Sequence, residues 1–184
     1  MKVSQLDKRD YIKLDDNIYQ VIDVVHTHLG RGGANVSLIL KDIGSGKRLE
    51  KNFKSDYDVE LIDIEEKEIK FSHRKGNNLI FRDKDKEYIL STKDKENILP
   101  YLVNGRNYIG LFFEEKLINI ILPKIIHFKV IASPPGIKGD SVQTSTKYVE
   151  VENGYQFKVP LFIKTGDIIA INSETGEYIE RVNS

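Results

Sequence analysis

The chain of 184 residues has no cysteine and no net formal charge, since its 28 basic side chains balance 28 acidic ones. Without cysteine there is no disulfide framework, no thiolate metal site and no cysteine nucleophile. Because the charges balance, overall charge does not predict a nucleic-acid binder, and such a role must rest on local charge. A composition of 40% hydrophobic and 30% charged residues indicates a folded globular chain rather than a disordered one.

Long apolar runs are also missing. The first ten residues contain no apolar segment, so we expect no secretory signal peptide. The densest apolar stretch, Leu117–Val130, is interrupted by Asn119, Pro123, Lys124 and His127. It is too short and too polar to cross a bilayer. We therefore expect a cytoplasmic protein without membrane association.

What the sequence does contain is strand patterning along its whole length. In Ala34–Ile43, for example, Val36, Leu38 and Leu40 share one face of an alternating segment. Turn pairs recur roughly every 8–12 residues, as in β-barrels and sandwiches. The predicted strands are Ile18–Val25, Ala34–Ile43, Lys47–Lys54, Leu61–Phe71, Leu79–Arg82, Glu87–Leu90, Tyr108–Phe113, Leu117–Leu122, Ile125–Ala132, Tyr148–Val151, Tyr155–Val159, Ile168–Ile171 and Tyr178–Val182.

One short helix is predicted near the middle of the chain. Ser91 or Thr92 can cap it, and Lys93–Leu102 can form it. The Asn104-Gly105 pair can end it, and Pro100 limits or kinks it.

Positive charge gathers in one part of the sequence. Residues 31–54 hold six basic side chains and two acidic ones, whereas residues 127–184 hold six basic and seven acidic. We therefore predict a basic rim on the N-terminal part that can face RNA. Its members are Arg31, Lys41, Lys47, Arg48, Lys51 and Lys54.

Arg31 lies in an unusual tip segment that joins two apolar strands. The segment consists of His28, Leu29, Gly30, Arg31, Gly32, Gly33 and Ala34. Its glycines leave no side-chain bulk beside Arg31, so the cation suits a narrow anionic cleft such as one lined by RNA. The alternative is an ordinary hairpin turn with an exposed arginine. The glycines match neither the dinucleotide-binding spacing nor a phosphate-binding loop.

Signs of catalysis or of a metal site are weak. His26 and His28 share a strand face and can offer two metal ligands, but no third ligand is nearby. Nothing resembles a nucleophile elbow. We expect no metal and no catalytic residue.

A second unusual loop, Ser133–Ser141, presents Lys138 followed by Gly139, Asp140 and Ser141. Such a loop can contact phosphates or sugars through N–H and hydroxyl groups. The alternative is a long connection between barrel strands.

These motifs resemble, in the same order, those of bacterial elongation factor P. Leu29–Ala34 is similar to the family's Pro-Gly-Lys-Gly-Gly-Ala, and Pro135–Ser141 is similar to Pro-Gly-Leu-Lys-Gly-Asp-Thr. The closing segment Thr175–Val182, with Tyr178 and Arg181, is similar to Ser-Gly-Glu-Tyr-x-x-Arg-Val. The resemblance covers essentially the whole chain.

The resemblance implies an all-β, L-shaped molecule of three small barrels. An SH3-like, KOW-type domain would occupy residues 1–63, a central OB-fold residues 64–126 and a C-terminal OB-fold residues 127–184. The short helix would belong to the central domain.

The function that the resemblance implies is that of a translation elongation factor rather than an enzyme. It would bind both ribosomal subunits beside the P-site tRNA and stimulate peptide-bond formation at consecutive prolines. Arg31 would reach toward the peptidyl-transferase centre, and Lys138–Ser141 would lie near the E-site codon of the mRNA. We expect a monomer without a cofactor.

Two departures from the family pattern leave alternatives open. Arg31 replaces a lysine that the family extends, so it is either rhamnosylated by an arginine rhamnosyltransferase or unmodified. Hypusine and lysyl-lysine are excluded, because both are built on a lysine amine. The segment 142–146 lacks the family's glycines, so codon contact there stays open. A diverged paralogue of the family, a generic OB-fold RNA-binding protein and a histidine–metal hydrolase are the other hypotheses.

Overall fold

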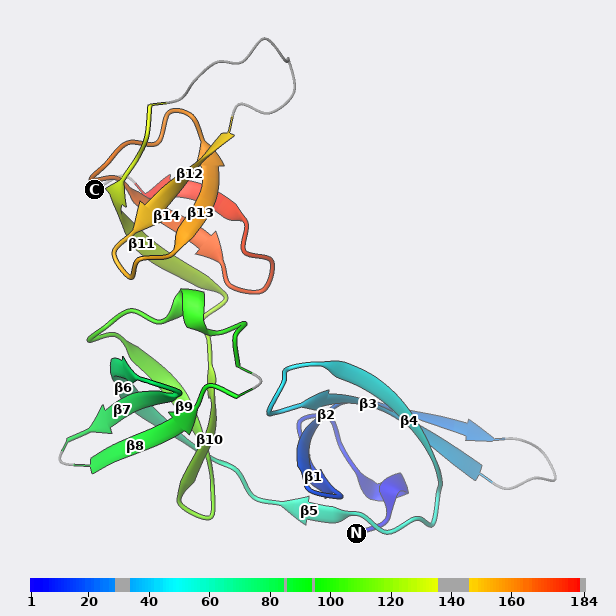
Figure 1. Cartoon of the computed structure of the whole chain (residues 1–184). Coiled ribbons are helices and arrows are strands. Elements are labelled where there is room, and N and C mark those ends of the chain that lie inside the picture. Colours follow the sequence, from blue (N-terminus) through cyan, green and yellow to red (C-terminus); the bar gives the residue numbers. More distant parts are fainter. Residues whose placement is uncertain (29–33, 85, 94, 136–145, 183–184) are drawn as a thin grey trace.

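The computed structural model describes residues 1–28, 34–84, 86–93, 95–135 and 146–182. Over these ranges the chain forms three five-stranded antiparallel sheets, each built from a continuous part of the sequence. The central and C-terminal domains are stacked, and the N-terminal domain lies beside the central one, so the molecule is L-shaped (Figure 1). The predicted all-β, L-shaped architecture is confirmed, with three separate sheets.

The N-terminal sheet has the strand order β4-β3-β2-β1-β5. Its β2–β3 pair continues from Tyr19–Asp42 to His28–Ala34, with a bulge between Val21 and Asp23. The strand β1 was not predicted from the sequence. The elements are the 3-10 turn η1 (Val3–Gln5) and the strands β1 (Tyr11–Leu14), β2 (Asn17–His28), β3 (Ala34–Asp42), β4 (Arg48–Lys54) and β5 (Glu60–Ile62).

The central sheet has the order β10-β9-β6-β7-β8. The predicted strand Leu61–Phe71 is broken here, since β5 ends at Ile62 in the first sheet and β6 begins at Glu65 in the second. The strands are β6 (Glu65–Lys75), β7 (Asn78–Asp83), β8 (Lys86–Ser91), β9 (Asn107–Phe113) and β10 (Lys116–Ile121).

The C-terminal sheet has the order β13-β12-β11-β14-β15. Its first strand begins two residues before the domain start expected at residue 127. The strands are β11 (Ile125–Ala132), β12 (Thr146–Val151), β13 (Gln156–Pro160), β14 (Ile168–Asn172) and β15 (Tyr178–Val182).

The helix predicted over Lys93–Leu102 is wrong. In the described part of this segment the chain forms turns, followed by the 3-10 turn η3 (Leu99–Tyr101). Pro100 cannot donate a backbone hydrogen bond to a longer helix. In addition, Tyr101 packs into the C-terminal core and Leu102 into the central core, so neighbouring residues are drawn toward two different domains.

Candidate nucleic-acid interface

The hairpin of β2 and β3 projects from the N-terminal barrel, away from the central domain (Figure 1). Near the barrel, Val36 of β3 is fully buried, whereas Val25 and His26 of β2 are exposed. The ladder ends with the His28–Ala34 pair. Leu29, Gly30, Arg31, Gly32 and Gly33 connect the two ends and lie outside the described residues.

The predicted basic residues other than Arg31 occupy both faces of the β3–β4 edge of the N-terminal sheet. Lys41, Lys47, Arg48 and Lys54 are exposed. Burial alternates along β4, which turns Lys51 to the other face. There its Nζ lies 5.7 Å from the centroid of the Tyr19 ring. Lys51 therefore packs within the domain, unlike the four exposed cations.

The exposed cations lack local compensation. Lys41 and Arg48 are directly paired across β3 and β4, an arrangement that costs free energy because like charges repel. Among the described residues, none of Lys41, Lys47, Arg48 and Lys54 forms an ion pair. The acidic neighbour Glu50 instead accepts a hydrogen bond of 2.6 Å from Ser37 Oγ. This edge can therefore accept a polyanion such as an RNA backbone.

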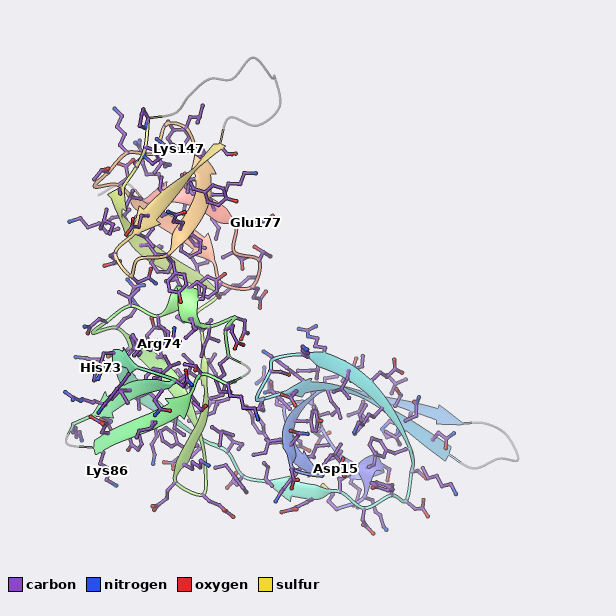
Figure 2. The ribbon with its side chains drawn as sticks, viewed as in Figure 1. Asp15, His73, Arg74, Lys86, Lys147 and Glu177 are labelled. Carbon is purple, nitrogen blue, oxygen red and sulfur yellow. The ribbon has the colours of Figure 1, made fainter. Side chains whose placement is uncertain are left out.

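The second candidate loop starts and ends at the far end of the C-terminal domain (Figure 1). Ser133 Oγ donates a hydrogen bond of 2.9 Å to Ile163 O, and Lys147 Nζ donates one of 3.1 Å to Pro134 O. Lys147 projects at this end of the domain in Figure 2. These bonds fix both ends of the connection between β11 and β12. Lys138, Gly139, Asp140 and Ser141 lie outside the described residues.

Tyr178 and Arg181 act within the C-terminal domain. Tyr178 packs against its core, and burial raises the pKa of its phenol. The Arg181 guanidinium lies 3.8 Å from Asp167 Oδ2 and 5.8 Å from the Phe162 ring centroid. The motif that contains them therefore secures β15 against the loop before β14.

The histidines do not assemble a metal site in the part of the chain that the structure describes. No three His, Asp or Glu side chains converge there in a way that can hold a metal ion. His73 Nδ1 instead lies 3.1 Å from Ser72 Oγ, on the outer side of the central domain (Figure 2). No helix within the described ranges is long and apolar enough to cross a membrane.

Residues at the domain junctions were not predicted from the sequence. Asn153 Nδ2 donates hydrogen bonds of 2.8 Å to Pro100 O and 3.0 Å to Leu102 O, joining the C-terminal and central domains. Lys95 and Asn119 join the central and N-terminal domains in the same way. Each acceptor is a backbone carbonyl, which every residue carries, so no sequence motif marks the contact.

Comparison with known proteins agrees with this architecture. Residues 2–59 match the family model "Elongation factor P (EF-P) KOW-like domain", and residues 126–181 match "Elongation factor P, C-terminal". The chain is 33% identical over 173 residues to elongation factor P of Carboxydothermus hydrogenoformans, covering 93% of this chain and 94% of that protein. It is 34% identical over 172 residues to elongation factor P of Moorella thermoacetica, with 92% and 93% covered.

A solved structure is similar in fold. A translation initiation factor eif-5a family protein from Naegleria fowleri aligns with a TM-score of 0.51 at 17% identity, covering 66% of this chain and 96% of that one. The matches to both family models, and the identity to relatives over nearly their full length, show that this chain belongs to the elongation factor P family of translation elongation factors.

Proposed function

We propose that this protein binds the ribosome beside the P-site tRNA and stimulates peptide-bond formation where consecutive prolines stall it. The observation that carries the proposal is the β2–β3 hairpin. In a chain of this family, this hairpin extends as a paired ladder to His28 and Ala34, the first and last residues of the Arg31 tip segment. The segment between these two residues contains one cation, Arg31, among three glycines, a composition that suits a narrow RNA-lined cleft.

The proposed role of the tip is to position reactants rather than to react. Holding two reactants in the right geometry removes much of the entropic cost of the reaction. Arg31 has a planar guanidinium that can bind phosphate or sugar oxygens and can stack on bases, which suits the CCA end of the tRNA. Either an unmodified Arg31 or one that carries rhamnose from an arginine rhamnosyltransferase fits this role.

The other proposed partners are assigned from two further parts of the molecule, the basic edge of the N-terminal sheet and the loop between β11 and β12. The uncompensated cations Lys41, Lys47, Arg48 and Lys54 would face ribosomal or transfer RNA. The loop with Lys138, Gly139, Asp140 and Ser141 would lie on the small subunit near the E-site codon. The protein would act as a monomer in the cytoplasm, where ribosomes work.

The test is a reconstituted translation reaction that times peptide-bond formation on a message with consecutive prolines. A message without proline pairs is the control. Protein purified from its native cells should raise the rate on the proline message and leave the control rate unchanged. Equal rates with and without the protein on the proline message would contradict the proposal.

A further inference from the structure

The N-terminal domain is joined to the rest of the molecule differently from the C-terminal domain. Tyr101 and Val103 of the central domain belong to the C-terminal hydrophobic core, and Leu122 packs against both cores. Among the described residues, the N-terminal core contains only members of its own domain, from Val3 to Val59. In the part of the chain that the structure describes, a shared apolar core therefore joins the central domain to the C-terminal one, and no shared core joins either of them to the N-terminal domain.

Two polar side chains of the central domain hold the N-terminal domain instead. Lys95, whose side chain is buried at 6% exposure, donates a hydrogen bond of 3.0 Å from Nζ to Gly44 O. Asn119, beside a bulge in β10, donates from Nδ2 to Ile43 O. The two domains could rotate about a single hydrogen bond. Two hydrogen bonds, donated from separate segments to adjacent carbonyls, resist that rotation. We call this pair of bonds the junction clamp.

The clamped turn is firmly bonded to the N-terminal sheet. Asp42 Oδ1 accepts hydrogen bonds from Ser45 N at 2.6 Å and from Ser45 Oγ at 2.9 Å. Gly46 N donates to Asp42 O at 2.8 Å, and Ile43 N donates to Ile18 O at 2.9 Å. A force on the carbonyls of Ile43 and Gly44 is therefore passed to β2 and β3.

The clamp lies at the opposite end of β3 from the tip. Strand β3 runs from Ala34, the last residue of the tip segment, to Asp42, next to the clamped turn. Nine residues of strand span roughly 30 Å at about 3.4 Å each. A rotation of about 10° at the turn would then move the tip end by about 5 Å over that length. A misplacement of about 1 Å can cost about 100-fold in rate in a reaction that depends on position.

Packing leaves room for such a rotation. A cleft of about 660 Å³ lies at the junction and is lined by all three domains, with Gln20, Glu66 and Ser173 among its walls. Because open space borders the junction there, the direction of the hairpin is sensitive to the clamp and to the short covalent link at residues 63–64.

From these contacts we infer that Lys95 and Asn119 are positioning residues, which set the angle of the N-terminal domain and so aim the Arg31 tip. The inference rests on the proposed function for the role of the tip, but the angle itself can be measured without ribosomes. Lys95→Met removes a donor and keeps the length of the side chain. Asn119→Asp keeps the shape and replaces the donor by an acceptor that repels Ile43 O.

The first measurement is the distance between spin labels on the two domains. The chain has no cysteine, so Asn52→Cys and Lys86→Cys, both at exposed positions, give specific labelling. The unclamped double variant, Lys95→Met with Asn119→Asp, should give a broader or shifted distance distribution than the wild-type background. Lys95→Arg, which keeps a donor, and the exposed control Lys93→Met should give the wild-type distribution. An unchanged distribution in the double variant would overturn the clamp.

The second measurement is the rate of synthesis across consecutive prolines. The double variant should lose roughly 5- to 100-fold in rate, as expected when the docked orientation loses two hydrogen bonds, and Lys95→Arg should retain the wild-type rate. Thermal melting of each variant serves as the control that its domains stay folded. A wild-type rate in a double variant with a broadened distribution would overturn the positioning role. If the wild-type protein itself did not accelerate synthesis across consecutive prolines, the proposed function would be contradicted. The distances between the spin labels would still show whether the clamp sets the angle of the N-terminal domain.

Discussion

Gly30, Gly32 and Gly33 leave Arg31 as the sole side chain of any size in that stretch of sequence. Arg31→Ala should therefore slow synthesis across consecutive prolines severely while ribosome affinity falls modestly, because most of the contact area lies elsewhere. Lysine keeps the charge but loses the planar fork and any sugar attached to arginine. The assay compares wild type, Arg31→Ala and Arg31→Lys, in protein from native cells and from a heterologous host.

The two states of Arg31 give different results in this series. If Arg31 carries rhamnose, Arg31→Lys should behave nearly like Arg31→Ala, and the intact mass from native cells should exceed that of the bare chain. If it is unmodified, Arg31→Lys should retain part of the activity. Full activity of Arg31→Ala would remove this residue from the mechanism.

Tyr108 is a residue whose importance is structural. Its buried hydroxyl donates a hydrogen bond of 2.8 Å to Tyr101 O and accepts one of 2.9 Å from Val103 N. Tyr108→Phe leaves both backbone groups unpaired and should cost about 1–3 kcal/mol of unfolding free energy. Urea titration measures this, with Tyr148→Phe, at an exposed position, as the control.

The same substitution should show a dependence on pH. Burial raises the pKa of the Tyr108 phenol above the ordinary 10.0. Above pH 10.0 the unfolded chain loses this proton first, so the contribution of Tyr108 is complete below that pH and is lost as pH rises through the folded-state pKa. The stability difference between wild type and Tyr108→Phe should shrink as pH rises above that value. A constant difference would contradict the assignment.

At the scale of elements, the sequence predicted the strands better than the helix. In β3, Val36, Leu38 and Leu40 are all buried, as their alternation predicts, because a two-residue period depends only on which face meets the core. The prediction of a helix over residues 93–102 failed because the conformation of this segment depends on groups far away in the sequence. Lys95 is drawn to Gly44 of another domain, and local propensity carries no information about that contact.

The loop between β11 and β12 gives a prediction at this scale. Its ends are fixed by Ser133 and Lys147, so substitutions within it should leave the barrel unchanged. Asp140→Ala with Ser141→Ala should reduce the rescue of stalled ribosomes, because it removes polar groups proposed to contact RNA. Asp16→Ala, on an exposed turn of the N-terminal domain, is the control. Unchanged rescue with unchanged circular dichroism would show that the loop is only a connection.

At the scale of the whole molecule, the family motifs indicated three domains but not what holds them together. The tip and loop motifs can be found in a sequence because their chemistry lies in short runs of particular residues. The contacts of Asn153, Lys95 and Asn119 join a side chain to a backbone carbonyl far along the chain. Such pairs leave no pattern of spacing, and only the folded structure identifies them.

Ribosome binding should depend on salt although the net charge is zero. Phosphate contacts release counterions, so affinity falls linearly on logarithmic axes as salt rises. Arg48→Met and Lys54→Met should each reduce the slope of that line by about 1, the amount expected for the loss of one phosphate contact. Lys86→Met, on the outer side of the central domain (Figure 2), should leave it unchanged. An affinity that stays flat across the salt series would contradict the basic surface.

In the proposed function, the tip of the β2–β3 hairpin lies beside the P-site tRNA. The direct measurement is RNA cleavage by a hydroxyl-radical probe tethered to Gly32→Cys, which leaves Arg31 in place, on ribosomes stalled at consecutive prolines. The same probe on Lys86→Cys is the control. We expect cleavage at the CCA end of the P-site tRNA from position 32 and none there from position 86. Cleavage from position 32 only at other sites of the ribosome would contradict it.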